Sequence, residues 1–161
     1  MDALKKLMLS RPGLRLAAAE SVTCGRIQAR IGAVSGASEY FLGGITAYTL
    51  DQKVRHLGVD RAIAEEVNCV SAEVAGQMAC GACRLFGANL GVATTGYAEP
   101  AAKWHVAEPF VWWALAHRRG NGRFAVRCGR VDYPGESRTQ VQKLAASAAL
   151  AALEGFLASL R

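Results

Sequence analysis

Two short runs of the chain are apolar almost throughout, and each is followed by polar residues. They are LRLAAA at 14–19 and NLGVAT at 89–94. A run of this kind is typical of a strand buried on both faces, because helices then cover both sides of the sheet. We therefore expect two central strands in a sheet that lies between layers of helices.

The order of the other elements supports the same fold class. Helical spacing and punctuation by Gly, Pro and capping residues predict helices at 2–10, 23–33, 49–58, 60–66, 71–87 and 138–160. FLGGITAY at 41–48 predicts another strand, and FVWWALAH and RFAVRCGRV, joined by RRGNG, predict a hairpin. Strands that alternate with helices, together with one hairpin, indicate an α/β fold, a three-layer α/β/α sandwich with a mixed sheet.

Length and composition indicate one domain over residues 1–161, since the chain has 161 residues and 52% of them are hydrophobic. The N-terminus lacks the features of a secretory signal, and no apolar run approaches the roughly 20 residues that cross a bilayer. Five cysteines without an export signal argue against a disulfide framework. We expect a cytoplasmic protein without a membrane partner. Its net charge of +6 favours anionic ligands without naming one.

Polar residues follow both central strands at the same end. Glu20 and Ser21 come after the first strand, and Thr95 and Gly96 come at the end of the second. Ligands of such sheets bind beyond the carboxyl ends of the strands, so these residues are predicted to share one pocket. The segment ESVTCG runs into a helix, where hydroxyls and backbone amides stabilise an anion. The alternative is that Ser21 or Thr23 only caps the helix.

Metal and standard nucleotide motifs are missing from the sequence. The three histidines are scattered, and no phosphate-binding GxxxxGKS loop occurs, so we expect neither a metal nor a cofactor. Cys80 and Cys83 fall within a predicted helix and are expected in the core. Cys24 lies near a helix start, and is either a nucleophile or a packed small residue.

A serine nucleophile in this setting would need a base other than histidine. A lysine serves when burial lowers its pKa. Lys53 follows Tyr48 by five residues and is close enough for both to reach the strand end, although a solvated helix lysine is the alternative. Ser38, in the turn-like segment SGASEY, is a second available hydroxyl.

These segments together resemble the CinA C-terminal domain family. AESVTCG is similar to that family's AESCTGG, and SGASEYFLGGITAYTLDQKVRHLGV to its PGSSxxFxGGxxxYxxxxKxxxLGV. CVSAEVAGQMACGA is similar to AVSxxVAxxMAxGA, and TTGYAEP to TGIAGP. The resemblance extends from about residue 14 to 116 and continues weakly into the last helix.

The resemblance implies an amidohydrolase that converts nicotinamide mononucleotide and water into nicotinic acid mononucleotide and ammonia. It implies that Ser38 is the nucleophile or catalytic hydroxyl, activated by Tyr48 and Lys53, although Ser21 can exchange places with Ser38. It also implies a small-molecule nucleotide as partner; the apolar last helix leaves room for a homodimer surface. The substrate-binding residues expected at the pocket are Glu20, Ser21, Thr23, Gly25, Thr95, Gly96 and Arg138.

The chain departs from the family pattern near the expected pocket. Cys24 and Glu99 replace glycines, and AAKWHVAEPFV replaces a glycine-rich loop. Larger residues there would narrow the site, and Glu99 would repel a phosphate. The competing hypothesis is therefore a paralogue that has lost or redirected catalysis and binds a nucleotide or a protein.

Arginines on the hairpin open a third possibility, a nucleic-acid surface. They are Arg118, Arg119, Arg123, Arg127 and Arg130. Phe124, Val126 and Cys128 would then point to the core. We favour the alternative that charge protects an exposed edge strand, and expect no nucleic-acid partner.

Overall fold

The protein is built on one mixed sheet with strand order β2-β1-β3-β4-β5. The structure, a computed structural model, describes residues 2–160. The strands are β1 (Leu16–Glu20), β2 (Phe41–Thr46), β3 (Leu90–Tyr97), β4 (Phe110–Arg118) and β5 (Phe124–Asp132). β1 pairs in parallel with β2 and β3, whereas β4 pairs antiparallel with β3 and β5. The predicted mixed sheet and hairpin are confirmed.

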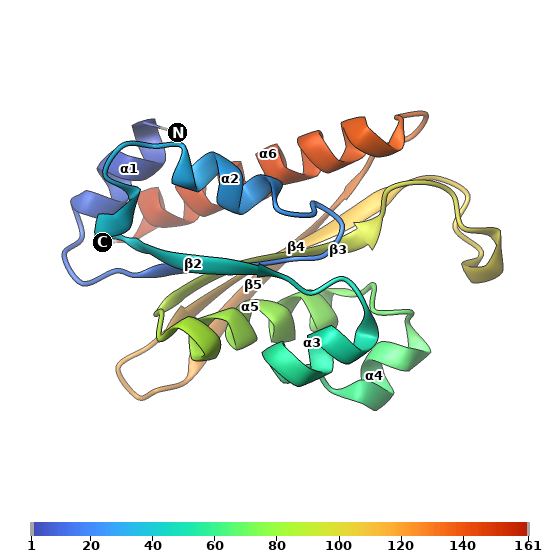
Figure 1. Cartoon of the computed structure of the whole chain (residues 1–161), viewed down its shortest axis with the longest axis horizontal. Coiled ribbons are helices and arrows are strands. Elements are labelled where there is room, and N and C mark those ends of the chain that lie inside the picture. Colours follow the sequence, from blue (N-terminus) through green and yellow to red (C-terminus); the bar gives the residue numbers. More distant parts are fainter. Residues whose placement is uncertain (1, 161) are drawn as a thin grey trace.

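Helices cover both faces of this sheet (Figure 1). α1 (Asp2–Leu9), α2 (Arg26–Gly32) and α6 (Arg138–Ser159) lie on one face. α3 (Leu50–Leu57), α4 (Arg61–Glu66) and α5 (Ala72–Phe86) lie on the other. Two short 3₁₀ helices, η1 (Ala37–Glu39) and η2 (Ala102–Trp104), complete the chain. The three-layer α/β/α sandwich predicted from the sequence is confirmed.

β1 is buried at every residue, which explains its unbroken apolar run. Leu16 and Ala18 belong to the core on one side of the sheet, and Ala17 and Ala19 to the core on the other. Small residues let the helices approach closely. A Cβ on Gly91 in β3 would lie 2.3 Å from the carbonyl oxygen of Ala79, so α5 packs directly against the strand backbone there.

β3 continues beyond the predicted end of the second central strand. Thr95, Gly96 and Tyr97 still pair with β4, because the antiparallel ladder extends past Glu20, where pairing with β1 ends. Thr95, Gly96 and Tyr97 form the part of the functional site's wall that extends toward solvent.

α6 confirms the apolar helix predicted at 138–160 and ends one residue earlier, at Ser159. Its 22 residues meet the length and composition of a membrane span, with a mean hydropathy of 1.3 over 18 residues, and half of that window is buried. The buried residues face β3, β4, α1 and α2. α6 is thus the core helix on this face of the sheet, which accounts for its apolar composition.

β5 is an edge strand, and its residues are more exposed than predicted. Val126 and Cys128 point toward α5, but both are exposed because the helix covers only part of the strand. Arg127 and Arg130 lie over the rings of Phe156 and Phe110 respectively. The expectation that Val126 and Cys128 lie in the core is wrong, whereas the edge position is confirmed for Arg127 and Arg130, which lie on β5.

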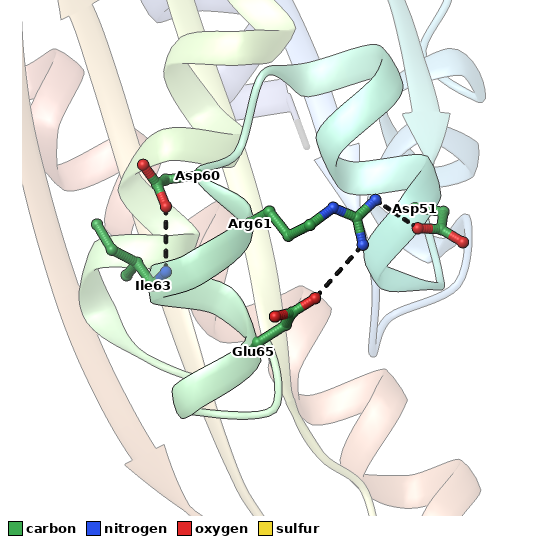
Figure 2. A network of polar contacts seen from close by, with 5 residues as sticks. All are labelled: Asp51, Asp60, Arg61, Ile63 and Glu65. Atoms are coloured by element: carbon green, nitrogen blue, oxygen red, sulfur yellow. Dashed lines mark hydrogen bonds and ion pairs between the residues drawn. The ribbon is translucent and has the colours of Figure 1, made fainter.

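A small polar network joins α3 to α4 and fixes the helix that carries Lys53 (Figure 2). Arg61 contacts Asp51 on α3 at 2.6 Å and Glu65 on its own helix at 3.5 Å. Asp60 caps α4 by accepting a hydrogen bond from the backbone amide of Ile63. Exposed ion pairs of this kind contribute little to stability, but here they orient two short helices against each other.

Candidate active site

A cavity of about 410 Å³ lies beyond the carboxyl ends of β1 and β3. This volume is within the range of small-molecule sites, roughly 300–1,000 Å³. Its walls come from segments that are distant in the sequence, namely residues 21–22, 48–50, 53, 68–70, 95–101 and 138. The pocket predicted from the two polar strand ends is therefore present.

Glu20 organises the chain at the end of β1 instead of binding a ligand. Its side chain is buried and accepts hydrogen bonds from the backbone amides of Ile27 and Gln28 at 3.0 and 2.9 Å. The Glu20 side chain also accepts a hydrogen bond from the Thr23 hydroxyl at 2.6 Å. The Thr23 hydroxyl oxygen in turn lies 2.7 Å from the Thr94 hydroxyl oxygen. A carboxylate at a helix N-terminus satisfies free amides and is favoured by the helix dipole. Neither Glu20 nor Thr23, both predicted to bind substrate, lines the cavity.

Cys24 and Gly25 form the tight entry to α2. Both have left-handed backbones, with φ of 50° and 91°, a conformation that glycine adopts without strain. The Cys24 side chain is exposed, and neither residue lines the cavity. Gly25 is therefore placed as a turn residue outside the cavity lining, and Cys24 does not narrow the cavity.

Lys53 is the only lysine among residues 2–160 that lines the cavity, and it is 1% exposed. Its Nζ donates hydrogen bonds to Ser21 Oγ at 3.0 Å and to the carbonyl oxygen of Tyr48 at 2.7 Å. Burial lowers the pKa of the Lys53 ammonium, and the nearby Cys69 thiol acts weakly in the opposite direction. The alternative of a solvated lysine is excluded.

Ser21 is held at the end of β1 with its hydroxyl against this lysine. Its backbone amide donates to the Thr94 carbonyl oxygen at 3.0 Å and fixes the backbone beside β3. Ser38, by contrast, is exposed on η1, which precedes β2, whereas the cavity lies at the carboxyl ends of the strands. Within one chain the hydroxyl that Lys53 contacts is therefore that of Ser21, and Ser38 lies outside the cavity lining.

A loop between α4 and α5 forms a wall that the sequence analysis missed. Asn68 and Cys69 have φ of 48° and 61°, and their backbones turn toward the cavity. The Thr95 hydroxyl donates to the Cys69 carbonyl oxygen at 2.6 Å, and Asn68 donates to the Tyr97 hydroxyl at 3.0 Å. Asn in a left-handed turn was an available signal for this loop, whereas no sequence pattern marked Cys69.

The mouth of the cavity is crossed by polar contacts of Arg138, the first residue of α6. Its guanidinium donates to Glu99 Oε1 at 2.9 Å and to the Tyr48 hydroxyl at 2.7 Å. The Tyr48 side chain thus belongs to the mouth, while its carbonyl oxygen belongs to the Lys53 environment. Of the predicted substrate-binding residues, the structure brings Ser21, Thr95, Gly96 and Arg138 to the cavity.

The comparison with known families agrees with this arrangement. The model of the CinA C-terminal domain matches residues 2–157. The chain belongs to the CinA C-terminal domain family. It shares the fold of the competence damage-inducible protein A from Klebsiella pneumoniae, with a TM-score of 0.88 and 27% identity over 99% of this chain and 96% of that one. The competence/damage inducible protein CihA from Agrobacterium tumefaciens gives a TM-score of 0.82 and 30% identity, over 96% and 93% of the two chains.

Among curated CinA-family proteins, the putative competence-damage inducible protein of Desulforamulus reducens is 37% identical over 150 residues. That match covers 93% of this chain but 35% of the relative, and a CinA-like protein of Citrifermentans bemidjiense is matched over 24% of its length. The chain therefore spans about a quarter to a third of these curated relatives.

The departures from the CinA pattern affect the site to different degrees. Within the altered segment at 99–111, Glu99, Pro100 and Ala101 line the cavity. Residues 102–111 do not. η2 and Trp104 instead lie in an exposed projection from the sheet (Figure 1). Glu99 is therefore the departure that bears directly on ligand binding.

The buried amine of Lys53, in contact with the Ser21 hydroxyl, is an arrangement that can support nucleophilic attack by the serine. A neutral lysine accepts the serine proton, and the ammonium that results returns a proton to a leaving group. Among residues 2–160, no group of three or more His, Cys, Asp or Glu side chains is arranged to hold a metal ion.

Proposed function

We propose that this domain is a nicotinamide-nucleotide amidohydrolase of pyridine nucleotide salvage in the cytoplasm. It would hydrolyse nicotinamide mononucleotide to nicotinic acid mononucleotide and ammonia. The observation that carries the proposal is the contact between buried Lys53 and Ser21 at the base of a nucleotide-sized cavity. Family membership supports a CinA-type domain, and the resemblance described from the sequence supplies the substrate.

The reaction follows from this contact. Neutral Lys53 takes the proton of Ser21 Oγ as the oxygen attacks the amide carbon, which gives a tetrahedral oxyanion beside the new ammonium. Lys53 then gives the proton to the departing nitrogen, and ammonia leaves behind an ester on Ser21. Water, deprotonated by the same amine, hydrolyses the ester and restores Ser21.

The lowered pKa of Lys53 favours these steps. A lysine in water stays protonated near neutral pH and cannot act as a base, whereas burial favours the neutral amine. The Tyr48 carbonyl oxygen holds one N–H of the amine, so its lone pair can face Ser21 when the proton is absent. In that state the hydrogen bond between the two residues reverses, and Ser21 becomes the donor.

The test is ammonia release from nicotinamide mononucleotide by the purified protein, beside Ser21→Ala, Lys53→Ala and Ser38→Ala variants. We expect Ser21→Ala and Lys53→Ala to abolish turnover, and denaturing mass spectrometry to detect a nicotinoyl-nucleotide ester on Ser21. Ser147→Ala, on the exposed side of α6, is the control for a generic loss of a hydroxyl.

Other outcomes would change the assignment. Turnover that survives Ser21→Ala but not Ser38→Ala would move the nucleophile to Ser38. Absence of turnover in a folded wild-type protein would favour the alternative of a nucleotide- or protein-binding paralogue. The predicted homodimer is checked in the same preparation by light scattering coupled to gel filtration.

A further inference from the structure

The mouth of the cavity holds a pair of opposite charges that come from distant parts of the chain. Glu99 follows β3, Arg138 begins α6, and their side chains meet at 2.9 Å. Both side chains are partly exposed, at 62% and 44% respectively, so the pair is open to solvent. Both residues line the cavity on its exposed side, so a ligand bound there meets this pair.

Arg138 is the group to which an anionic ligand would bind. Among the described residues that line the cavity it is the only arginine, and the one other cation, Lys53, lies buried at the base. A guanidinium holds phosphate or carboxylate through two parallel N–H bonds. Two of its five N–H donors are already used, one by Glu99 and one by Tyr48.

Glu99 is the only carboxylate among the described residues that line the cavity. Any anionic group that binds Arg138 must either displace Glu99 or lie beside its negative charge, and like charges at contact distance oppose binding. A ligand without an anionic group meets no such cost. The residue therefore acts on one chemical feature of the ligand.

We propose that Glu99 is a specificity-determining residue that competes with the ligand's phosphate for Arg138 and so weakens the preference for nucleotides over nucleosides. The inference rests on the proposed function for its substrate, and it deepens that function by naming what the entrance selects. Tyr48 supports this role of Glu99, because its hydroxyl accepts a hydrogen bond from Arg138 and keeps the Arg138 guanidinium directed across the mouth of the cavity.

The test compares Glu99→Gln with the wild type on nicotinamide mononucleotide and on nicotinamide riboside, which lacks the phosphate. We expect Glu99→Gln to lower KM for the mononucleotide roughly three- to tenfold and to change KM for the riboside less than twofold, because an exposed ion pair of this kind is weak. Glu136→Gln removes a charge two residues before Arg138 but outside the cavity lining, and should change neither value.

A second comparison introduces Glu99→Gln into an Arg138→Gln background. In that background Glu99→Gln should improve mononucleotide binding less than it does beside Arg138, because the competition for the guanidinium is gone and only the repulsion between Glu99 and the phosphate remains. An equal improvement for both substrates, no improvement for the mononucleotide, or an improvement that is as large without Arg138 would each overturn the proposal.

A binding experiment separates this proposal from the proposed function. Calorimetry with nicotinamide mononucleotide and with inorganic phosphate is run on Ser21→Ala proteins with and without Glu99→Gln, where no turnover is needed. Tighter binding of either anion to the double variant supports the role of Glu99 even if the wild type releases no ammonia. Unchanged binding of both overturns the proposal even if the wild type is an active deamidase.

Discussion

Replacing Lys53 with Met should separate activity from stability. The change removes the base, so kcat for ammonia release should fall by at least about 10²–10⁴, the contribution of general acid–base catalysis. The folded protein should not become less stable, because an ammonium that is 1% exposed is costly to bury and Met fills a similar volume. At pH 7 we expect the free energy of unfolding to stay equal or to rise by up to about 2 kcal/mol.

The pH dependence of this difference follows from the lowered pKa of Lys53. Between the folded pKa and the unfolded value near 10.5, the unfolded chain binds the additional proton, so wild-type stability rises with pH there. Each unit of lowering corresponds to about 1.4 kcal/mol. The advantage of Lys53→Met should therefore be largest below the folded pKa of Lys53 and disappear as pH approaches 10.5. For the same reason wild-type kcat/KM should rise with pH and level off below 10.5.

The assays are urea unfolding at several pH values and ammonia release over the same range. Lys143→Met, at an exposed position on α6, is the matched control and should change neither. The reasoning fails if Lys53→Met loses more than about 1 kcal/mol at pH 7, since the two hydrogen bonds of Lys53 would then outweigh the cost of its burial.

Three further predictions concern other parts of the fold and site. Glu20→Ala should lower the free energy of unfolding by about 3 kcal/mol in urea titrations, because two α2 amides and the Thr23 hydroxyl lose their acceptor, and an unchanged midpoint would contradict this. Gly81→Ala should lower the free energy of unfolding by about 3 kcal/mol, since a Cβ there would lie 2.2 Å from the Leu57 carbonyl oxygen. Gly155→Ala on α6, where a Cβ would have nothing within 4 Å, should instead raise the free energy of unfolding by about 0.5–1 kcal/mol. Alkylation by N-ethylmaleimide should abolish the proposed ammonia release through Cys69 in the cavity wall, and slowly, because burial raises the pKa of its thiol. Cys69→Ala should resist, and equal loss of ammonia release in both proteins would place the reactive thiol elsewhere.

The fold was predictable because its strongest signals are local. Buried strands lack alternation, and helices begin at residues such as Ser71, whose hydroxyl accepts from the Val74 amide, and end at glycines such as Gly87 with a left-handed backbone. These features depend on neighbours within a few residues. The exposure of Val126 was not predictable in this way, because it depends on how much of β5 the α5 helix covers.

The site was predictable in outline and less so in its details. Strand ends indicated the pocket, and spacing placed Lys53 near it. Ser21 and Ser38 could not be distinguished, because each is a hydroxyl in a turn and only the sheet shows which end each turn occupies. The contacts of Glu20 could not be predicted for a related reason, since a carboxylate after a strand can cap a helix or bind a ligand, and here it accepts hydrogen bonds from the amides of α2.

Tyr48 makes contacts at both ends of the cavity, one through its backbone and one through its side chain. Its carbonyl oxygen holds Lys53, and its hydroxyl holds Arg138. Every amino acid at position 48 would supply that carbonyl, so substitutions there alter the entrance and leave the lysine in place. The contact that holds Lys53 is thus independent of the side chain at position 48, whereas the contact with Arg138 depends on it. Substitution of Tyr48 should therefore change what the cavity admits and leave the position of Lys53 unchanged.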